Sequence, residues 1–527
     1  MRLPLLALLL SAQTALLSQT AVSTAHYDNY RTGANIYETI LTPANVNSEQ
    51  FGKLANLPVS GCVFAQPLYA PYVTMPEGTT RNLVIIATTT NTVYAYDADD
   101  YSLHFSINFG IPAPSKDFDP ERGYYAFPDC EAGTLEGPVG IVSTPVIDTL
   151  SNALYFVANV IDDFEEPHRH RHFLHKISLT TGDALAKPVE ITGKYEGVSF
   201  QSRYHLQRAA LLLHNDAVYI AFGSHQDEEP YSGWMFAYDT ELRQLAVMSY
   251  SPVKSGAGIW QAGGGPATDG RYVYLTTGNL ASNEGDRNDN ADSILQIDPS
   301  TLAVTAKTSF YPEANLWALT DLDLGSSRVI PIPGYPYAIA GSKVGDLFIV
   351  DRGGMALAGR FQAATRRSDG FDWTGIYNGL AFWNDTIYVW AGGGGFFWEP
   401  PFPTDTLKAF VFTAEGLALA ANGQSDGIGV GYQGANIVVS ANGNDPATGI
   451  VWAHVPSDNS PDLQNGYLRA YHATDFSKGV FKELWNNVDD EPASFAKFNQ
   501  PLVANGKVFL PTFSSKVIVY GLTAAAR

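Results

Sequence analysis

The sequence predicts an all-β chain folded as an eight-bladed β-propeller, and a recurring strand pattern is the main evidence. A short apolar strand core, usually closed by a polar residue, occurs eight times. The copies are Tyr94–Asp97, His175–Ser178, Phe236–Asp239, Leu295–Asp298, Phe348–Asp351, Lys408–Val411, Arg469–His472 and Ile518–Gly521. Their starts lie 49 to 81 residues apart, and a repeat of this length with several β runs per unit is typical of radially arranged sheets. Seven blades are the alternative.

Each repeat is expected to hold three or four strands. In the third repeat they cover 209–213, 217–223, 234–238 and 244–250, where β-branched and aromatic residues alternate with polar ones. No stretch keeps a 3.6-residue apolar period, so helix should be scarce. The last repeat, 499–521, is too short for four strands. We expect Phe51 to Ser60 to supply the missing outer strand and close the ring.

Composition favours one large domain over residues 26–527, because the repeat spans nearly all of the 527-residue chain. The net charge of −21 argues against nucleic acid and anionic membranes, which bind clustered Lys and Arg. A monomer is expected. The segments 112–138, 396–405 and 456–466 are rich in Pro, Gly, Asp or aromatic residues and are predicted to be surface loops.

The N-terminus has the order of a secretory signal peptide: Arg2, an apolar stretch, then small and polar residues up to Ala25. A secreted, extracellular protein with no membrane anchor is therefore expected. Its two cysteines, Cys62 and Cys130, then favour one disulfide, with two buried free thiols as the alternative. Asn384 begins the one glycosylation sequon noted.

A polar residue next to Pro or another small or polar residue precedes several predicted inner strands. In a propeller the inner strands line the axis, so these residues should form a polar ring at one mouth of the central channel, the default ligand site. The junctions are Gln66-Pro67, Thr144-Pro145, Gln207-Arg208, Gly265-Pro266, Asn378-Gly379 and Gln500-Pro501.

Two carboxylates, Asp321 and Asp323, stand just before an inner strand, and residues two apart on extended backbone share a face. Such a pair can hold Ca²⁺ or divide into acid and base, and Lys343 is expected to supply the countercharge. Side chains that cap tight turns are the alternative interpretation.

Two further clusters carry ligand chemistry. Asp286, Asn288, Asn290 and Asp292 have the alternate-oxygen spacing of a calcium loop but lack the EF-hand glycine and twelfth acid. A solvated Asx-rich turn is our preferred interpretation, with a surface calcium site as the alternative. The histidines at 168, 170 and 172 alternate with arginines. On a strand they would share one face and could hold a transition metal, although a solvated hairpin is our preferred interpretation.

Most of the chain past residue 26 resembles the quinoprotein-like propellers with pyrroloquinoline-quinone repeats, particularly their secreted bacterial and fungal branch. The matching segments are YDNYRTGANIYETILTPANVN (27–47), FAQPLYAPYV (64–73), GIVSTPVIDT (140–149), QRAALLLHNDAVYIAFGSH (207–225), GIWQAGGGPATDGRYVYLTTGN (258–279), TDLDLGSSRVI (320–330), GSKVGDLFIVDR (341–352), and GIVWAH with GYLRAYHATD within 449–475.

This resemblance implies the propeller fold, but the group includes redox enzymes and non-catalytic assembly factors. Its redox members hold the quinone on the axis over a Trp, with Ca²⁺ on carboxylate and amide oxygens and an Asp as base. By analogy Trp260 is the candidate stacking floor, with a core aromatic between blades as the alternative, and Asp321 or Asp323 is the calcium ligand or base. The sequence departs from the alcohol-oxidising subgroup, which pairs neighbouring cysteines, because Cys62 and Cys130 are 68 positions apart. We therefore keep Ca²⁺ as a candidate and do not expect pyrroloquinoline quinone.

The functional hypothesis is a small or carbohydrate-like ligand bound at the axial mouth, with oxidation of a hydroxyl as the enzymatic version. Asp321, Asp323, Arg208 and His205 are the candidate catalytic residues. A non-catalytic binding or scaffold propeller, and a cofactor-free pocket that directs cyclisation of a metabolite, remain alternatives. The expected ligand-binding residues are Gln66, Gln207, His225, Trp260, Gln261, Lys343 and Gln500.

Overall fold

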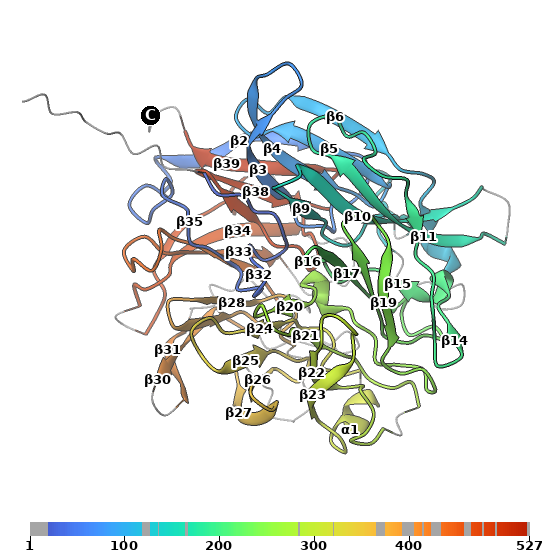
Figure 1. Cartoon of the computed structure of the whole chain (residues 1–527). Coiled ribbons are helices and arrows are strands. Elements are labelled where there is room, and N and C mark those ends of the chain that lie inside the picture. Colours follow the sequence, from blue (N-terminus) through green and yellow to red (C-terminus); the bar gives the residue numbers. More distant parts are fainter. Residues whose placement is uncertain are drawn as a thin grey trace, which may run out of the picture.

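The computed structural model describes residues 19–118, 127–134, 136–163, 167–282, 285–319, 321–364, 375–392, 405–413, 416–422, 434–457, 465–476, 479–490 and 493–523. Eight separate sheets of mostly four antiparallel strands surround one axis (Figure 1), and the prediction of an eight-bladed β-propeller is confirmed. The predicted scarcity of helix is confirmed as well, since 3% of the structure is helical. Among the described residues, no helix is long and apolar enough to span a membrane.

The first four blades follow the chain from inner to outer strand. Blade 1 contains β3 (Leu68–Thr74), β4 (Thr80–Ala87), β5 (Thr92–Asp97) and β6 (Leu103–Asn108). Blade 2 contains β9 (Val146–Asp148), β10 (Ala153–Ile161), β11 (His170–Ser178) and β12 (Val189–Glu190). Blade 3 contains β16 (Leu212–His214), β17 (Ala217–Ser224), β18 (Trp234–Asp239) and β19 (Gln244–Ser249), with β15 (His205–Leu206) also on β17. Blade 4 contains β20 (Ala267–Thr268), β21 (Val273–Thr276), β22 (Ser293–Ile297) and β23 (Val304–Ser309).

The second four blades repeat this order. Blade 5 contains β24 (Val329–Pro331), β25 (Tyr337–Ala340), β26 (Asp346–Asp351) and β27 (Ala356–Gln362). Blade 6 contains β28 (Leu380–Trp383), β29 (Thr386–Val389), β30 (Lys408–Thr413) and β31 (Gly416–Asn422). Blade 7 contains β32 (Asn436–Ser440), β33 (Ile450–Pro456), β34 (Asn465–His472) and β35 (Glu483–Asn486), with β1 (Ala34–Asn35) on β32 and β36 (Ala493–Ser494) on β34. Blade 8 contains β37 (Leu502–Ala504), β38 (Lys507–Pro511), β39 (Lys516–Leu522) and β2 (Phe51–Pro58).

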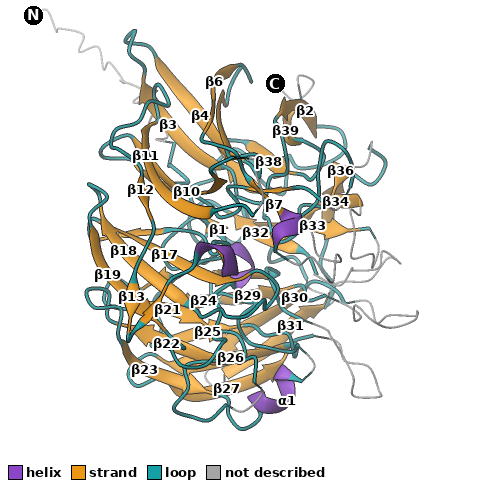
Figure 2. Ribbon diagram, turned by 90° about the vertical axis from the view of Figure 1, so that its right-hand side faces the viewer, coloured by secondary structure: helices purple, strands orange, loops and turns teal. Residues whose placement is uncertain are grey.

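The remaining elements lie in the loops around the sheets (Figure 2). Two short ribbons pair β7 (Ala113–Pro114) with β8 (Pro138–Val139) and β13 (Lys194–Tyr195) with β14 (Val198–Ser199). The helical turns are η1 (Ser115–Asp117), η2 (Ser202–Tyr204), η3 (Gln261–Gly263) and α1 (Ala314–Ala318). All eight copies of the recurring sequence phrase fall on the third strand of a blade, which explains why the phrase recurs once per sheet.

The ring closes through strands from opposite ends of the chain, as the sequence predicted. Strand β2 pairs antiparallel with β39 from Phe51 opposite Leu522 to Pro58 opposite Lys516, and the two lie side by side in Figure 1. This pairing completes blade 8, whose outer edge would otherwise be exposed. Apolar side chains then fill the space between blades; Val84 of blade 1, for example, shares a cluster with Val519 of blade 8.

The segment from Val22 to Asn35 runs inside the ring and hydrogen-bonds to a residue in, or just before, every inner strand. Its partners in blade order are Tyr69, Ile147, Leu213, Thr268, Arg328, Phe382, Val439 and Val503. A single stretch of backbone thus ties eight sheets together at the axis. The predicted boundary after Ala25 stays a prediction; residues 1–18 lie outside the described part, and Val22 and Ala25 are buried in this segment.

Arg31 lies at the centre of this segment and is completely buried. Its guanidinium donates to the carbonyls of Ala25 and Leu211 at 2.9 Å and Pro266 at 3.0 Å, and to the hydroxyl of Thr24 at 2.6 Å. Burial lowers the pKa of Arg31 to about 10, which leaves it charged at neutral pH. Each hydrogen bond from a charged group contributes about 1.5 to 3 kcal/mol.

We expect Arg31→Met to lower the free energy of unfolding by at least roughly 3 kcal/mol, because several buried oxygens lose their donor. Chemical denaturation measures this value. Arg271→Met is the matched control: Arg271 is exposed and its guanidinium lies 4.8 Å from the ring centre of Tyr272. A loss at Arg31 no larger than at Arg271 would contradict the structural role assigned to the segment.

Candidate ligand site at the axial mouth

The loops that precede the inner strands, and those that join second to third strands, meet at one face of the disc, which we call the mouth face. Trp260 precedes β20, Asp321 and Asp323 precede β24, and Lys343 lies between β25 and β26. Antiparallel alternation within each blade puts both kinds of loop at the same end of the sheets. Residues from blades 4 and 5 therefore meet at this face.

A lysine between two aspartates is the main charged feature of the mouth face. The Nζ of Lys343 lies 2.6 Å from Asp321 Oδ1 and 2.5 Å from Asp323 Oδ1. The Asp323 side chain is 3% exposed whereas that of Asp321 is 50% exposed. The structure thus brings together the three residues that the sequence suggested as a charged set.

Burial raises the pKa of Asp323 to about 6, against the opposing effect of Lys343. Negative charge on Asp321 and Asp227 raises it further. Asp292, also fully buried, accepts a hydrogen bond from the Leu324 N–H at 3.1 Å. Burial and the neighbouring Asp323 raise the pKa of Asp292 well above its usual range.

Trp260 lies next to Asp323, and three glycines pack closely against its indole ring. Added Cβ atoms at Gly223, Gly258 and Gly278 would lie 2.3 to 2.6 Å from its indole, so only glycine allows the backbone to pass this close. Its Nε1 donates to the Ser224 carbonyl at 3.0 Å. A Cβ at Gly278 would also lie 3.0 Å from Asp323 Oδ2, so the partly exposed indole and the carboxylate border the same position.

Two cations lie on another side of the mouth. Arg208 is buried, donates to the carbonyls of Val142 and Phe498 at 3.1 Å, and lies 5.6 Å from the ring centre of Phe64. Burial lowers its pKa to about 9.

Lys497, which sequence reasoning missed, lies 5.1 Å from the Phe498 ring centre. Burial, then Lys343 and Arg208, lower its pKa to about 8. Its position three residues before the Gln500-Pro501 junction was the available signal.

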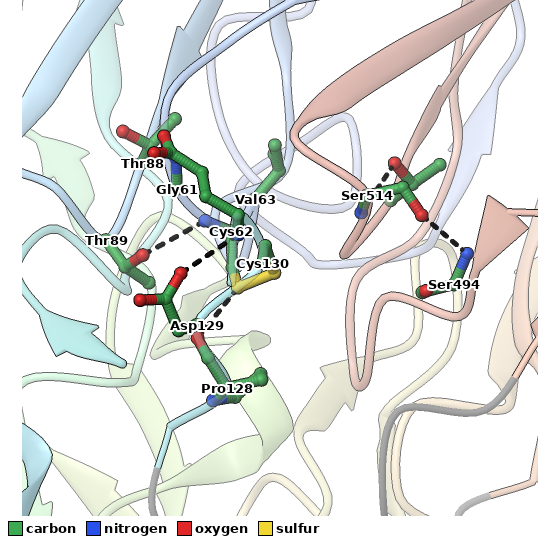
Figure 3. The surroundings of a disulfide bond; sticks show 12 residues. Gly61, Cys62, Val63, Thr88, Thr89, Pro128, Asp129, Cys130, Ser494 and Ser514 are labelled. Carbon is green, nitrogen blue, oxygen red and sulfur yellow. Dashed lines mark hydrogen bonds between the residues drawn. A yellow bond between two sulfur atoms is a disulfide. The ribbon is translucent and has the colours of Figure 1, made fainter. Parts of the chain in front are cut away.

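The predicted disulfide is confirmed and borders the mouth (Figure 3). Cys62, from the loop before β3, is bonded to Cys130, with 5.3 Å between their Cα atoms. The Cys62 N–H donates to Thr89 Oγ1 at 3.0 Å. The neighbouring Phe64 packs against Phe513 at 4.4 Å between ring centres, so the bridge joins an aromatic wall of the face.

Most amides of the predicted polar ring bond to one another or to neighbouring protein groups. Asn378 Nδ2 donates to Gln500 Oε1 at 2.8 Å, and Gln500 Nε2 donates to Gln66 Oε1. Gln207 Nε2 donates to the Ala209 carbonyl at 2.7 Å. Gln66, Gln207 and Gln500 are buried, so in this structure they brace the axis rather than line an open mouth. Gln261 is buried too, and its amide has no hydrogen-bond partner among the described residues.

His205 and His225 do not join the mouth residues. The Nδ1 of His205 lies 2.6 Å from the Gln201 carbonyl, and its Nε2 accepts the Ser232 N–H at 3.2 Å, so both ring nitrogens serve internal bonds. His225 is buried and stacks on Phe118, with ring centres 3.6 Å apart. A catalytic role for His205 therefore has no geometric support at this face.

The structure does not assemble the predicted calcium loop. Lys307 Nζ donates to the carbonyls of Asn288 at 2.9 Å and Asp289 at 2.5 Å, and to Asn290 Oδ1 at 3.1 Å. The lysine ammonium thus occupies the position between these oxygens that a cation would need. Asp286 accepts the Asn288 N–H at 2.6 Å, whereas Asp292 lies with Asp323. The four side chains therefore do not converge on one point.

The mouth does not fit a quinone with its calcium ion. Ca²⁺ takes six to eight oxygen ligands. Here Lys343 already holds both Asp321 and Asp323, so a calcium ion on this pair would have to displace the ammonium. Arg208 and Lys497 could form ion pairs with an acidic ligand, and Trp260 could stack against a planar ligand. Neither interaction requires a metal ion.

The sequence matches no protein-family model and no curated protein. The structure is similar to quinohemoprotein alcohol dehydrogenase ADHIIG from Pseudomonas putida HK5, with TM-score 0.61 and 13% identity, over 95% of this chain and 80% of that one. It is also similar to quinohemoprotein alcohol dehydrogenase from Comamonas testosteroni, with TM-score 0.60 and 15% identity, over 97% and 82% of the two chains. A europium-containing methanol dehydrogenase matches with TM-score 0.56 and 12% identity, over 95% and 98%.

These likenesses establish the class of fold. The chain is an eight-bladed β-propeller whose fold is similar to that of these dehydrogenases. At 12 to 15% identity they carry no activity or cofactor to this chain.

The raised pKa of Asp323 predicts an unusual pH trend. Between about pH 4 and 6 the folded protein keeps a proton on Asp323 that the unfolded chain has released, so wild type loses stability as the pH rises. Measured relative to Asp323→Asn, its free energy of unfolding should fall by up to roughly 3 kcal/mol between about pH 4 and 7. Denaturant melts across this range test the trend.

Asp100→Asn is a control of opposite sign. The hydroxyl and backbone N–H of Ser102 lower the pKa of Asp100, so wild type should not lose stability relative to this variant as the pH rises. A pH-independent difference between wild type and Asp323→Asn would refute the assigned burial effect.

Proposed function

We propose that this propeller binds a small, hydroxylated, carbohydrate-like ligand at the mouth face, with the Asp321–Lys343–Asp323 group as its polar anchor. The observation that carries the proposal is the position of this group beside Trp260 at one end of the axis. A flat aromatic surface next to paired donors and acceptors suits a ligand that has both an apolar face and hydroxyl groups.

The same group can move a proton. With a pKa of about 6, Asp323 is mostly ionised at pH 7 and can accept a proton from a ligand hydroxyl, while Lys343 can donate to the oxygen. Asp321, which is half-exposed, keeps the ammonium in place from the solvent side. The residues therefore support binding and proton transfer without a resident cofactor.

Full oxidation of the hydroxyl would also need an electron acceptor. The dehydrogenases that share the fold suggest a quinone, but the lysine between the aspartates disfavours the calcium-assisted arrangement. This observation favours the second candidate, a binding propeller without turnover. A pocket that orients a metabolite for cyclisation needs the same proton-transfer group and no acceptor.

Secretion belongs to the same proposal. The disulfide Cys62–Cys130 and the apolar N-terminal stretch support an extracellular protein. The sequon residue Asn384 lies in the turn between β28 and β29, at the face opposite the mouth, so a glycan there would leave the ligand site open.

A ligand screen with matched variants tests the proposal. We expect some sugars, polyols or aromatic alcohols to raise the melting temperature of the purified protein. Calorimetry should then show that the Trp260→Leu and Lys343→Met variants bind the same ligand about tenfold more weakly than wild type. Arg271→Met changes a turn on the opposite face and should bind as wild type does. Binding that survives both mouth variants would place the ligand elsewhere, and failure of the whole panel would reject the carbohydrate-like class.

The products separate the three versions. Reduction of a dye with an alcohol as substrate, after addition of quinone and Ca²⁺, would support the oxidoreductase hypothesis. We expect no dye reduction. An isomer of unchanged mass would indicate cyclisation, and unchanged ligand would indicate a binding protein.

A further inference from the structure

A second polar cluster lies away from the Asp321–Lys343–Asp323 group, between blades 2 and 3. Asp117, the last residue of η1, meets His168 and His170 at the start of β11. Asp117 Oδ2 lies 2.5 Å from His168 Nδ1 and 3.0 Å from His170 Nε2. All three atoms lie within 4.8 Å of one another.

The fold positions this group through backbone contacts. Ile161 of β10 is paired with His170, and its N–H donates to the Ile111 carbonyl at 3.0 Å, which places the chain leading to η1 beside β11. Arg203 in η2 donates to the Asp117 carbonyl at 2.9 Å and pairs with Glu228 at 2.8 Å. Asp117 is thus held from two sides.

The solvated-hairpin interpretation of the histidines is wrong for the side chains that the structure describes. The side chains of His168, His170 and Asp117 are 5%, 3% and 14% exposed. The arginines face the other way, as alternation requires, with Arg171 and Arg169 near Glu190 at 3.7 and 3.9 Å. The two imidazoles and the carboxylate are therefore largely shielded from solvent, with His170 buried and Asp117 and His168 partly exposed as whole residues.

Nearby imidazole nitrogens lack partners. The Nδ1 of His170, both ring nitrogens of His172 and the Nε2 of His225 have no hydrogen-bond partner among the described residues, although all three residues are buried. Phe118, the residue after Asp117, joins these rings, 5.0 Å from His170 and 3.6 Å from His225 between ring centres. Buried polar atoms are nearly always paired, so these ring nitrogens make the region suitable for a polar guest.

We propose that Asp117, His168 and His170 bind a divalent transition-metal ion, with Zn²⁺ as the first candidate, through Asp117 Oδ2, His168 Nδ1 and His170 Nε2. Two imidazole nitrogens and one carboxylate oxygen suit Zn²⁺ and its first-row neighbours. Ligand atoms about 2.1 Å from such an ion lie about 3.0 to 3.4 Å apart. Asp117 Oδ2 already lies 3.0 Å from His170 Nε2, whereas its 2.5 Å separation from His168 Nδ1 would have to widen when an ion enters. Three protein ligands leave a coordination position for water.

Cobalt is the probe for this site. The full secreted protein, produced without a histidine tag and stripped with a chelator, should bind one Co²⁺ with visible d–d absorption. Stoichiometric Zn²⁺ should displace it, and Zn²⁺ should raise the melting temperature. His168→Ala and Asp117→Asn should each weaken binding by at least about tenfold and remove the thermal shift. His104→Gln is the control, because His104 lies in β6 of blade 1, with its ring 2.7 Å from the Thr180 carbonyl.

Several results would overturn the proposal. Absence of a cobalt spectrum in wild type would mean that the cluster contains hydrogen bonds only. Equal cobalt affinity in wild type and in both ligand variants would place the metal at another site. Near-ultraviolet circular dichroism verifies that each variant is folded; if His168→Ala unfolds, Asp117→Asn, which keeps the side-chain shape, decides the question.

Discussion

Closure of the ring is the constraint on which the rest of this structure depends. The β2–β39 pairing joins positions more than 450 residues apart, and residues 22–35 then hydrogen-bond to all eight inner strands. Neither feature is local, so both cost chain entropy that the interblade cores must offset. Arg31 shows the consequence: a fully buried cation is tolerated only because carbonyls from blades 3 and 4 and from its own segment surround it.

The chemistry of the mouth follows from this closure. Ring formation removes water from Asp323 and Asp292, and the pKa values of both carboxyls rise because their charged forms lose solvation. Lys343 compensates for one negative charge and prevents the pair from acting as a simple cation site. The propeller has the same fold as the dehydrogenases that it resembles.

Sequence patterns were sufficient wherever the determining interaction was local or periodic. The recurring phrase marked all eight third strands, and the shortness of the last repeat indicated that Phe51–Pro58 would complete it. Asp321, Asp323 and Lys343 were also found, since each borders a strand of blade 5. Gln66 and Gln500 were placed correctly near the axis, but the hydrogen bonds that join Gln66, Gln500 and Asn378 depend on distances between blades that no local pattern contains.

The sequence by itself favoured eight blades over seven and a disulfide over free thiols, and it predicted the closing strand and the charged residues near the mouth, because alternation and repeat length act over a few residues at a time. Only the tertiary structure decided which polar groups are dry and which of them meet. It moved Asp292 from a calcium loop to the side of Asp323, and it brought Asp117 to His168 and His170 across 51 and 53 positions. Solvent exclusion and contact across blades arise when the ring closes, and for that reason they cannot be read from neighbouring residues.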